Sequence, residues 1–219
     1  MNLGQLMETY YELAGDKAVP HLASEPLVKV WANEAVTEAA CRGRLLVDSS
    51  DAMCSVAVGA GGSVVTLDPR IVFVRRARLA SQGCPLSPVH RGDLDRAFAG
   101  WESADPDVPV AYCPNLDTGS VRLIPPSAVA DTLKLTVVRE PLADMVGVDD
   151  EPEIPPRHHY ALIHWMLSRG LNKQDTETYD PVRAAKHEKD FEAVFGPRLS
   201  AIEEAWVSGE QGYDTDGSF

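Results

Sequence analysis

The first fifty residues carry apolar side chains at the three- and four-residue spacing that predicts two amphipathic helices. The first helix is expected over residues 3–13, and Gly15 follows it as a helix-ending residue. The second begins after Ser24, a residue type that caps helix N-termini, and ends near Gly43. The apolar positions of the first helix are Leu3, Leu6, Met7, Tyr10 and Leu13. Those of the second form two adjacent stripes, Leu27, Trp31, Ala35 and Ala39 beside Val28, Ala32, Val36 and Ala40.

From residue 52 the period of the apolar positions changes to that of β-strands. Residues 53–58 and 63–67 are expected to pair as a β-hairpin, with the glycine-rich residues 59–62 as its turn. Further strands are predicted at four segments, 71–79, 108–113, 120–124 and 132–138. A single helical turn is expected at 93–98. Together these elements indicate a small antiparallel β-unit.

Helical spacing returns after the acidic residues 149–153. Pro155 and Pro156 open a helix for which Gly170 is the expected C-cap, and Asp180 with Pro181 opens the next one. The buried face of the first of these is predicted to contain Tyr160, Ala161, Leu162, Trp165 and Met166. That of the second should contain Ala184, Ala185, His187, Phe191, Val194 and Phe195. Ser200 and Glu203 have capping-box spacing for a final helix.

This order of helices, strands and helices predicts an α+β protein. Residues 1–51 and 140–207 are expected to form a helical bundle, with residues 52–139 inserted as the antiparallel β-unit. Residues 208–219 are rich in glycine and aspartate and are expected to form a flexible tail.

The charge of the chain disfavours partners that are themselves anionic. With 20 basic and 33 acidic residues the formal net charge is −13, and residues 140–219 alone hold 17 acids and 7 bases. A protein that wraps DNA or binds a membrane surface needs the opposite sign. Residues 1–15 are acidic and lack the apolar core of a signal peptide, and no apolar run reaches the roughly 18 residues of a membrane span. We therefore expect a soluble protein with no membrane partner.

The residue types that carry chemistry show none of the spacings that catalysis or cofactor binding requires. Residues 59–62 are not followed by the Lys-Ser/Thr of a phosphate loop, and the acidic residues 149–153 are better explained as a helix-leading linker than as a cation site. Histidines that share a metal on one helix lie four apart, unlike His158, His159 and His164. Cys41, Cys54, Cys84 and Cys113 lack zinc-motif spacing and are expected to be reduced thiols. We expect neither an enzyme nor a cofactor.

One stretch of the chain is basic. No acidic residue lies between Asp68 and Asp93, whereas five arginines do: Arg70, Arg75, Arg76, Arg78 and Arg91. The stretch is either a solvated strand face or a contact for an acidic surface, which DNA phosphate or the acidic C-terminal part of a neighbouring copy could supply. Alternation along a strand places Arg75 opposite to Arg76 and Arg78.

Several segments resemble phage head-to-tail adaptor proteins. Residues 30–35 (VWANEA) are similar to the second helix of that family, and residues 67–74 (LDPRIVFV) to its first long strand. Residues 119–126 (GSVRLIPP) and 132–139 (TLKLTVVR) resemble its paired core strands. Residues 153–165 (EIPPRHHYALIHW) are similar to the start of its third helix. The resemblance covers residues 3–197.

The resemblance implies a structural virion protein in the phage neck, assembled in the host cytoplasm. Its implied form is a homododecameric ring that bridges the portal protein to the tail nozzle, tube or tail-fibre proteins. The genomic DNA would pass through the lumen without sequence-specific binding. The negative charge of the chain fits this arrangement, since an anionic lumen repels the DNA backbone.

Two sets of residues are expected at the interfaces of such a ring. Arg75, Arg76 and Arg78 should form salt bridges to a neighbouring subunit or the portal. Apolar residues near the C-terminus should anchor that segment on the portal or an adjacent subunit: Leu199, Ile202, Trp206, Tyr213 and Phe219. The alternatives are another neck protein (a stopper or tail-completion factor), a small phage or host hydrolase, and a nucleic-acid-binding module that uses the arginines.

Overall fold

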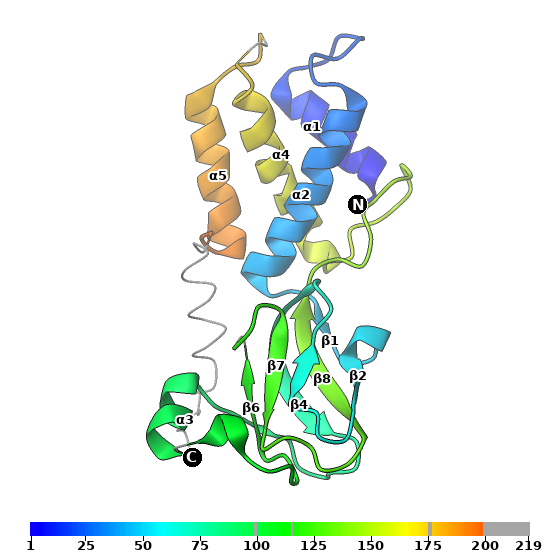
Figure 1. Cartoon of the computed structure of the whole chain (residues 1–219). Helices are drawn as coiled ribbons and strands as arrows, with labels where there is room; N and C mark the ends of the chain where they lie inside the picture. The colour runs from blue at the N-terminus through cyan, green and yellow to red at the C-terminus, as the bar shows by residue number, and fades with distance from the viewer. Residues whose placement is uncertain (99, 115, 175–176, 199–219) are drawn as a thin grey trace, which may run out of the picture. The chain divides into compact units, whose positions relative to one another are not determined.

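The computed structural model describes residues 1–98, 100–114, 116–174 and 177–198. Among them the chain divides into two compact units (Figure 1). Unit 1 contains Met1–Leu46 and Glu140–Arg198, and unit 2 contains Val47–Arg139. Unit 1 is helical and unit 2 is built mainly of strands, so the predicted α+β class is confirmed. The predicted final helix and tail lie outside the described residues.

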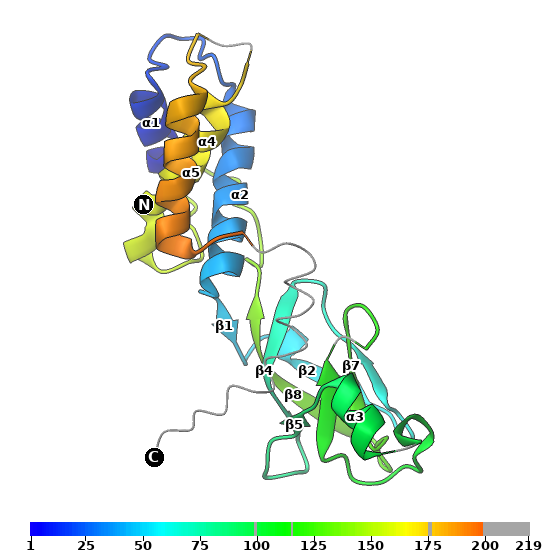
Figure 2. The same cartoon turned by 90° about the vertical axis from the view of Figure 1, so that its left-hand side faces the viewer.

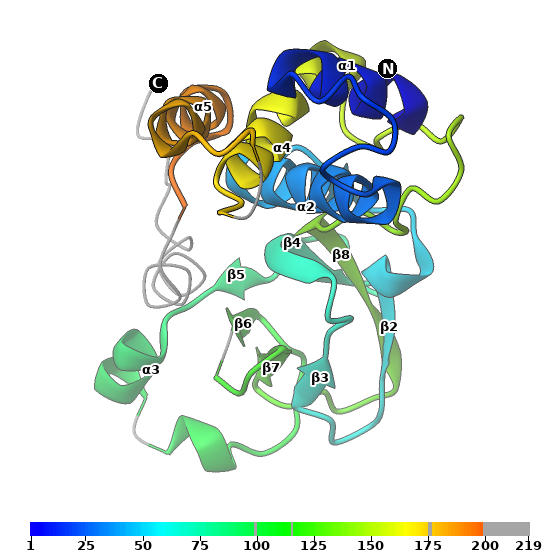
Figure 3. The same ribbon diagram turned by 90° about the horizontal axis from the view of Figure 1, so that it is seen from above.

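Unit 1 is a bundle in which α4 occupies the centre. Its helices are α1 (Leu3–Ala14), α2 (Glu25–Gly43), α4 (Leu162–Leu171) and α5 (Pro181–Phe195), with the 3₁₀ helix η3 (Pro156–Ala161) leading into α4. α4 contacts α1, α2 and α5, and the view from above shows it between them (Figure 3). The core contains Leu3, Tyr10, Trp31, Ala35, Trp165 and Phe191, all on the apolar faces that the sequence predicted.

The ends of these helices follow their sequence signals in part. Gly15 ends α1 in the left-handed conformation (φ 80°), as predicted. The side chain of Asp180 accepts the backbone N–H of Arg183 and so caps α5. Ser24 stands at the N-cap of α2 but its side chain makes no capping hydrogen bond.

Gly170 is not the C-cap of α4, contrary to the prediction. It lies inside the helix, whose C-cap is Asn172. A Cβ atom at Gly170 would lie 2.0 Å from Oη of Tyr10. The glycine is therefore explained by the close approach of α1 rather than by a turn.

Some positions predicted to be buried in unit 1 are exposed. Leu13, Tyr160, Ala185 and Val194 lie at the surface, and His187 is only partly buried. Tyr160 belongs to the 3₁₀ helix η3, in which three residues complete a turn, so the α-helical spacing used to predict its face does not apply.

Unit 2 contains two sheets. In the first, β8 pairs with β1, β2 and β4, and in the second the order is β3-β7-β6-β5. All pairs are antiparallel except β5 with β6, which is parallel. Figure 2 shows β4 beside β8, together with the short helix α3 (Arg91–Ala97). The strands are β1 (Val47–Asp48), β2 (Ser55–Val58), β3 (Val64–Thr66), β4 (Ile71–Leu79), β5 (Ser87–Pro88), β6 (Ala111–Pro114), β7 (Ser120–Ile124) and β8 (Asp131–Arg139).

The predicted hairpin is wrong, although its two strands exist. β2 pairs with β8 in one sheet, and β3 pairs with β7 in the other. Residues 59–62 therefore cross between sheets. The backbone of Gly61 has φ 74°, and its N–H donates to the carbonyl of Ser127, while the Ser127 N–H donates to the carbonyl of Gly62. These bonds tie the glycine loop to Ser127, and β2 and β3 do not pair with each other.

Candidate interaction surfaces

The arginines of β4 lie on the outer side of the first sheet. Ala77 and Leu79 are buried in the core of unit 2, whereas Arg76 is exposed and Arg78 is partly exposed. The ladder between β4 and β8 shifts register between Val74 and Arg76. Arg75 is the extra residue at this shift and is exposed. Strict alternation, which would put Arg75 on the side of Ala77, is interrupted by this bulge.

These three arginines have no partner in the part of the chain that the structure describes, where none of them makes an ion pair or side-chain hydrogen bond. Two other arginines of the acid-poor stretch behave differently. Arg70 forms two hydrogen bonds of 2.9 Å to the carboxylate of Asp68. Arg91 lies 3.8 Å from Asp95 and 3.9 Å from Glu102.

The adjacent strand adds a further positive charge to this face. Arg78 of β4 stands opposite Lys134 of β8, and Arg76 stands opposite Thr136. Among the described residues, Lys134 donates only to the hydroxyl of Ser55, at 2.9 Å. Like charges placed directly across a ladder destabilise a sheet unless an anion lies near them. The face formed by Arg75, Arg76, Arg78 and Lys134, hereafter the basic strip, is therefore suited to an acidic partner surface.

The C-terminal anchor residues predicted from sequence lie outside the described residues. The last described residue, Arg198, is placed by an ion pair of 3.6 Å to Glu38 of α2. The sequence did not single out this contact, although Glu34, Glu38 and Arg42 follow one another at four-residue spacing on α2.

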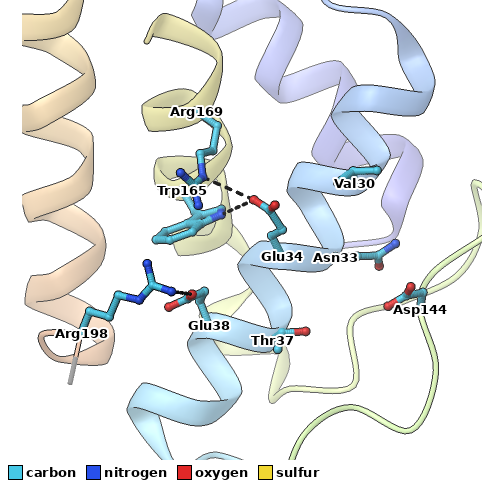
Figure 4. Close-up of a pocket in the computed structure, with 9 residues that line it drawn as sticks. All are labelled: Val30, Asn33, Glu34, Thr37, Glu38, Asp144, Trp165, Arg169 and Arg198. Atoms are coloured by element: carbon cyan, nitrogen blue, oxygen red, sulfur yellow. Dashed lines mark hydrogen bonds and ion pairs between the residues drawn. The ribbon is translucent and has the colours of Figure 1, made fainter. Parts of the chain in front are cut away.

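A hollow of about 410 Å³ lies in unit 1 beside α2 and α4, and Arg198 is part of its wall (Figure 4). Trp165 and Val30 are its apolar lining residues, and the indole Nε1 of Trp165 donates to Glu34 at 3.3 Å. The guanidinium of Arg169 lies 4.5 Å from the Trp165 ring and 3.3 Å from Glu34. The other lining residues are Asn33, Thr37, Glu38 and Asp144.

A buried arginine supports this wall from the side of the core. Arg42 bonds Glu38 through Nε at 2.8 Å and through a terminal nitrogen at 2.7 Å. Its guanidinium also lies 5.1 Å from the Trp165 ring. The two glutamates of the hollow are thus paired with arginines of α2, α4 and the residues after α5. The hollow is therefore lined by a network of ion pairs around the Trp165 ring.

The three histidines that the sequence grouped have separate environments. His159 is buried, with Nδ1 accepting from the Met1 amino group and Nε2–H donating to the carbonyl of Ile154, both at 2.8 Å. The ring of His158 lies 5.7 Å from that of Phe195. His164 instead meets His187 of α5, with 3.0 Å between the two Nδ1 atoms. Burial lowers the pKa of His187, and the nearby His164 lowers it further.

The remaining candidate groups fit structural roles. The carboxylate of Asp150, in the acidic linker, accepts the backbone N–H groups of Val146 and Gly147, and these bonds lower its pKa. None of the four cysteines is in a disulfide, and burial raises the pKa of the Cys54 and Cys113 thiols. None of the helices in the described residues is both long and apolar enough to cross a bilayer.

Comparison with known proteins gives one family. No curated protein sequence matches the chain. A family model described as SU10 adaptor protein matches residues 1–211, which include both units and most of the C-terminal segment. Since this match spans nearly all of the 219 residues, the chain belongs to the SU10 adaptor protein family, a family of phage head-to-tail adaptors.

Proposed function

We propose that copies of this adaptor form a closed ring of twelve subunits in the phage neck, which joins the portal to the tail and lines the channel through which DNA leaves. Family membership supports the role in the neck. The ring, the portal contact and the channel are the proposal. The subunit would assemble in the host cytoplasm and remain in the virion.

The basic strip is the observation that carries the proposal. Its arginines have no acidic partner among the described residues, in a chain whose net charge is −13. An arginine that becomes covered without an acceptor costs several kcal/mol. The acceptors would come from a neighbouring copy, whose residues 140–219 hold 17 acids, or from the portal. Such contacts would form between subunits of the ring or between ring and portal.

The C-terminal segment would supply a second contact. Its apolar residues Leu199, Ile202, Trp206, Tyr213 and Phe219 are separated by polar and glycine residues, which is typical of a segment that binds through isolated anchors. We propose that residues 198–219 dock on the portal, or failing that on an adjacent adaptor subunit.

The net charge supports the channel role. DNA carries one negative charge about every 1.7 Å of its axis, and a channel lined by acidic subunits repels it. Passage without adhesion needs no base-specific contacts.

Electron microscopy of the purified protein, alone and mixed with its portal, tests the proposal. We expect rings of twelve subunits on the portal. A monomer that never joins the portal would refute the proposal. Binding only to a preassembled portal–adaptor complex would instead indicate a stopper or tail-completion factor.

Charge reversal tests whether the basic strip makes these contacts. The variant Arg76→Glu with Arg78→Glu should impair ring assembly and leave the melting temperature of the monomer nearly unchanged. Arg91→Glu with Arg96→Glu is the control for net charge, since it makes the same charge change on exposed residues of unit 2 that already have acidic partners. If the first variant assembles normally and only genome retention or ejection suffers, the strip faces the channel.

Truncation tests the C-terminal contact separately. A chain that ends at Pro197 should remain folded, because unit 1 has its core within the described residues, and should fail to attach to heads. Normal attachment of the truncated protein would contradict the docking role of residues 198–219.

A further inference from the structure

Two neighbouring helices of unit 1 bring together three side chains that can ligate a metal ion. They are His164 on α4, and His187 and Asp190 on α5. One potential ligand atom from each lies within 4.8 Å of the others, and all three residues are partly exposed. The two Nδ1 atoms are 3.0 Å apart. No ion pair or hydrogen-bond network of the proposed neck function uses this cluster.

The positions of the three residues are set by the packing of the helices. His187 and Asp190 are three residues apart and therefore lie on the same face of α5. The residues next to the cluster form the contact between the helices: the rings of Trp165 and Phe191 lie 5.2 Å apart. Both aromatic residues are buried. The backbone that carries the histidines is thus fixed by the core before any ligand binds.

The chemistry of the donors selects a class of ion. Two imidazole nitrogens and a carboxylate are a ligand set for zinc and for neighbouring first-row divalent metals, and a hard ion such as Mg²⁺ prefers oxygen donors. In a tetrahedral site with Zn–N distances of about 2.05 Å, two nitrogens lie about 3.3 Å apart. The observed separation of 3.0 Å requires only a small opening of the pair.

We propose that His164, His187 and Asp190 bind one divalent first-row transition-metal ion, with a fourth position open to solvent. The bound ion would link α4 to α5. An alternative use of the pair, a hydrogen bond between the two rings, does not involve the carboxylate of Asp190. A loss of metal binding on substitution of Asp190 would therefore distinguish a metal site of three residues from a simple histidine pair.

The charges around the site limit its affinity. Arg183 and Lys186 on α5 electrostatically disfavour positive charge at His187, whereas Asp190 favours it. The site is therefore expected to bind Zn²⁺ more weakly than a structural zinc site with four protein ligands, and to keep it exchangeable.

Calorimetric titration of the full-length, untagged protein with ZnCl₂ tests the proposal. We expect one equivalent of Zn²⁺ to bind, and MgCl₂ to give no heat of binding. With Zn²⁺ at 100 times its dissociation constant, the melting temperature should rise by about 5 °C or more. CoCl₂ should give the intense visible absorption of a four-coordinate ion, which reports the coordination number of the bound metal.

Substitution of the ligands identifies the site. His187→Ala and Asp190→Asn should each weaken Zn²⁺ binding at least tenfold, and Asp190→Asn preserves the size of the side chain if the alanine variant folds poorly. His158→Ala, a histidine of the same unit outside the cluster, is the control and should bind as the unchanged protein does. The proposal is overturned if the unchanged protein binds no Zn²⁺. It is also overturned if both ligand variants bind Zn²⁺ normally, or if Asp190→Asn binds normally and only the histidine matters.

Discussion

Replacement of Gly170 by alanine should destabilise unit 1, although alanine is the better helix former. The added Cβ would lie 2.0 Å from Oη, 2.8 Å from Cζ and 2.9 Å from Cε2 of Tyr10. Tyr10 is only 2% exposed and lies in edge contact with Tyr11 and Trp31, with ring centroids 5.4 and 5.8 Å away. The ring therefore has no free space to move into, and the overlap must be relieved by separating α1 from α4.

Two opposing effects set the size of the change. Alanine in place of glycine within a helix gains about 1 kcal/mol from the unfolded state. Overpacking of a core costs about 1–3 kcal/mol, and more when backbone must move. A contact of 2.0 Å belongs at the upper end of that range. We expect a net loss of about 2 kcal/mol, which corresponds to a fall in melting temperature of about 4–8 °C for a chain of this size.

Thermal and urea unfolding followed by the helical circular-dichroism signal measures this loss. Gly92→Ala is the control, because its Cβ would meet its nearest neighbour at an ordinary 3.4 Å. Adding Tyr10→Phe to Gly170→Ala removes the oxygen and should recover part of the loss, since the ring carbons at 2.8 and 2.9 Å remain. If Gly170→Ala is as stable as the unchanged protein, the close approach does not explain the glycine.

Three further changes test unit 2. Hydrogen bonds from the backbone of Ser50 and from Arg139 hold the pKa of Asp48 below its usual range, so this carboxylate stabilises the fold above about pH 4 and loses that effect as the pH falls through the lowered value. Asp48→Asn should therefore cost about 2 kcal/mol in urea unfolding at pH 7 and much less near pH 2. Gly61→Ala should lower the free energy of unfolding by about 1 kcal/mol in the same assay, because φ is 74° and L side chains rarely adopt it. No atom lies within 4 Å of the new Cβ, so no steric overlap adds to this cost. An unchanged urea midpoint would show that the loop relaxes. Burial raises the pKa of Tyr112 to about 12, so the stability gained from its un-ionised hydroxyl is present below pH 10 and is lost by pH 12. Tyr112→Phe should therefore lose less stability than the unchanged protein between pH 10 and pH 12. An equal loss in both proteins would show that Tyr112 does not cause it.

The local periodicity of the sequence predicted which segments are helices or strands, but not which strands pair. β7 has the predicted limits of residues 120–124, and the burial of Trp31 and Ala35 follows the helical stripe. The pairing of β2 and β3 depends on β8 and β7, which are more than fifty residues away along the chain. A glycine-rich segment between two short strands is equally compatible with a hairpin and with a crossing between sheets.

Single glycines and arginines were predicted less well, because their roles depend on neighbours distant in sequence. Gly170 has the position of a C-cap in the sequence, and only the approach of Tyr10 reveals its function. Arg75 is exposed because of a bulge that strand alternation does not predict. The exposure of Arg76 and the partial exposure of Arg78 do follow from alternation. The contact of His164 with His187 joins two helices, and no spacing within one helix could have identified it.

Because unit 2 is inserted within unit 1, it is synthesised completely before unit 1 is. β1 and β8 are the first and last strands of unit 2 and pair with each other, with Val47 opposite Val138. The inserted unit therefore has all its strands once residue 139 has emerged, while α1 and α2 still lack α4 and α5. From the end of α2 at Gly43 to the end of α5 at Phe195 the ribosome adds 152 residues. At synthesis rates of about 5–20 residues per second, the apolar faces of α1 and α2 therefore wait about 8–30 s for the whole bundle. The first two helices must be kept from aggregating during translation, whereas the inserted sheets can fold as soon as they are made.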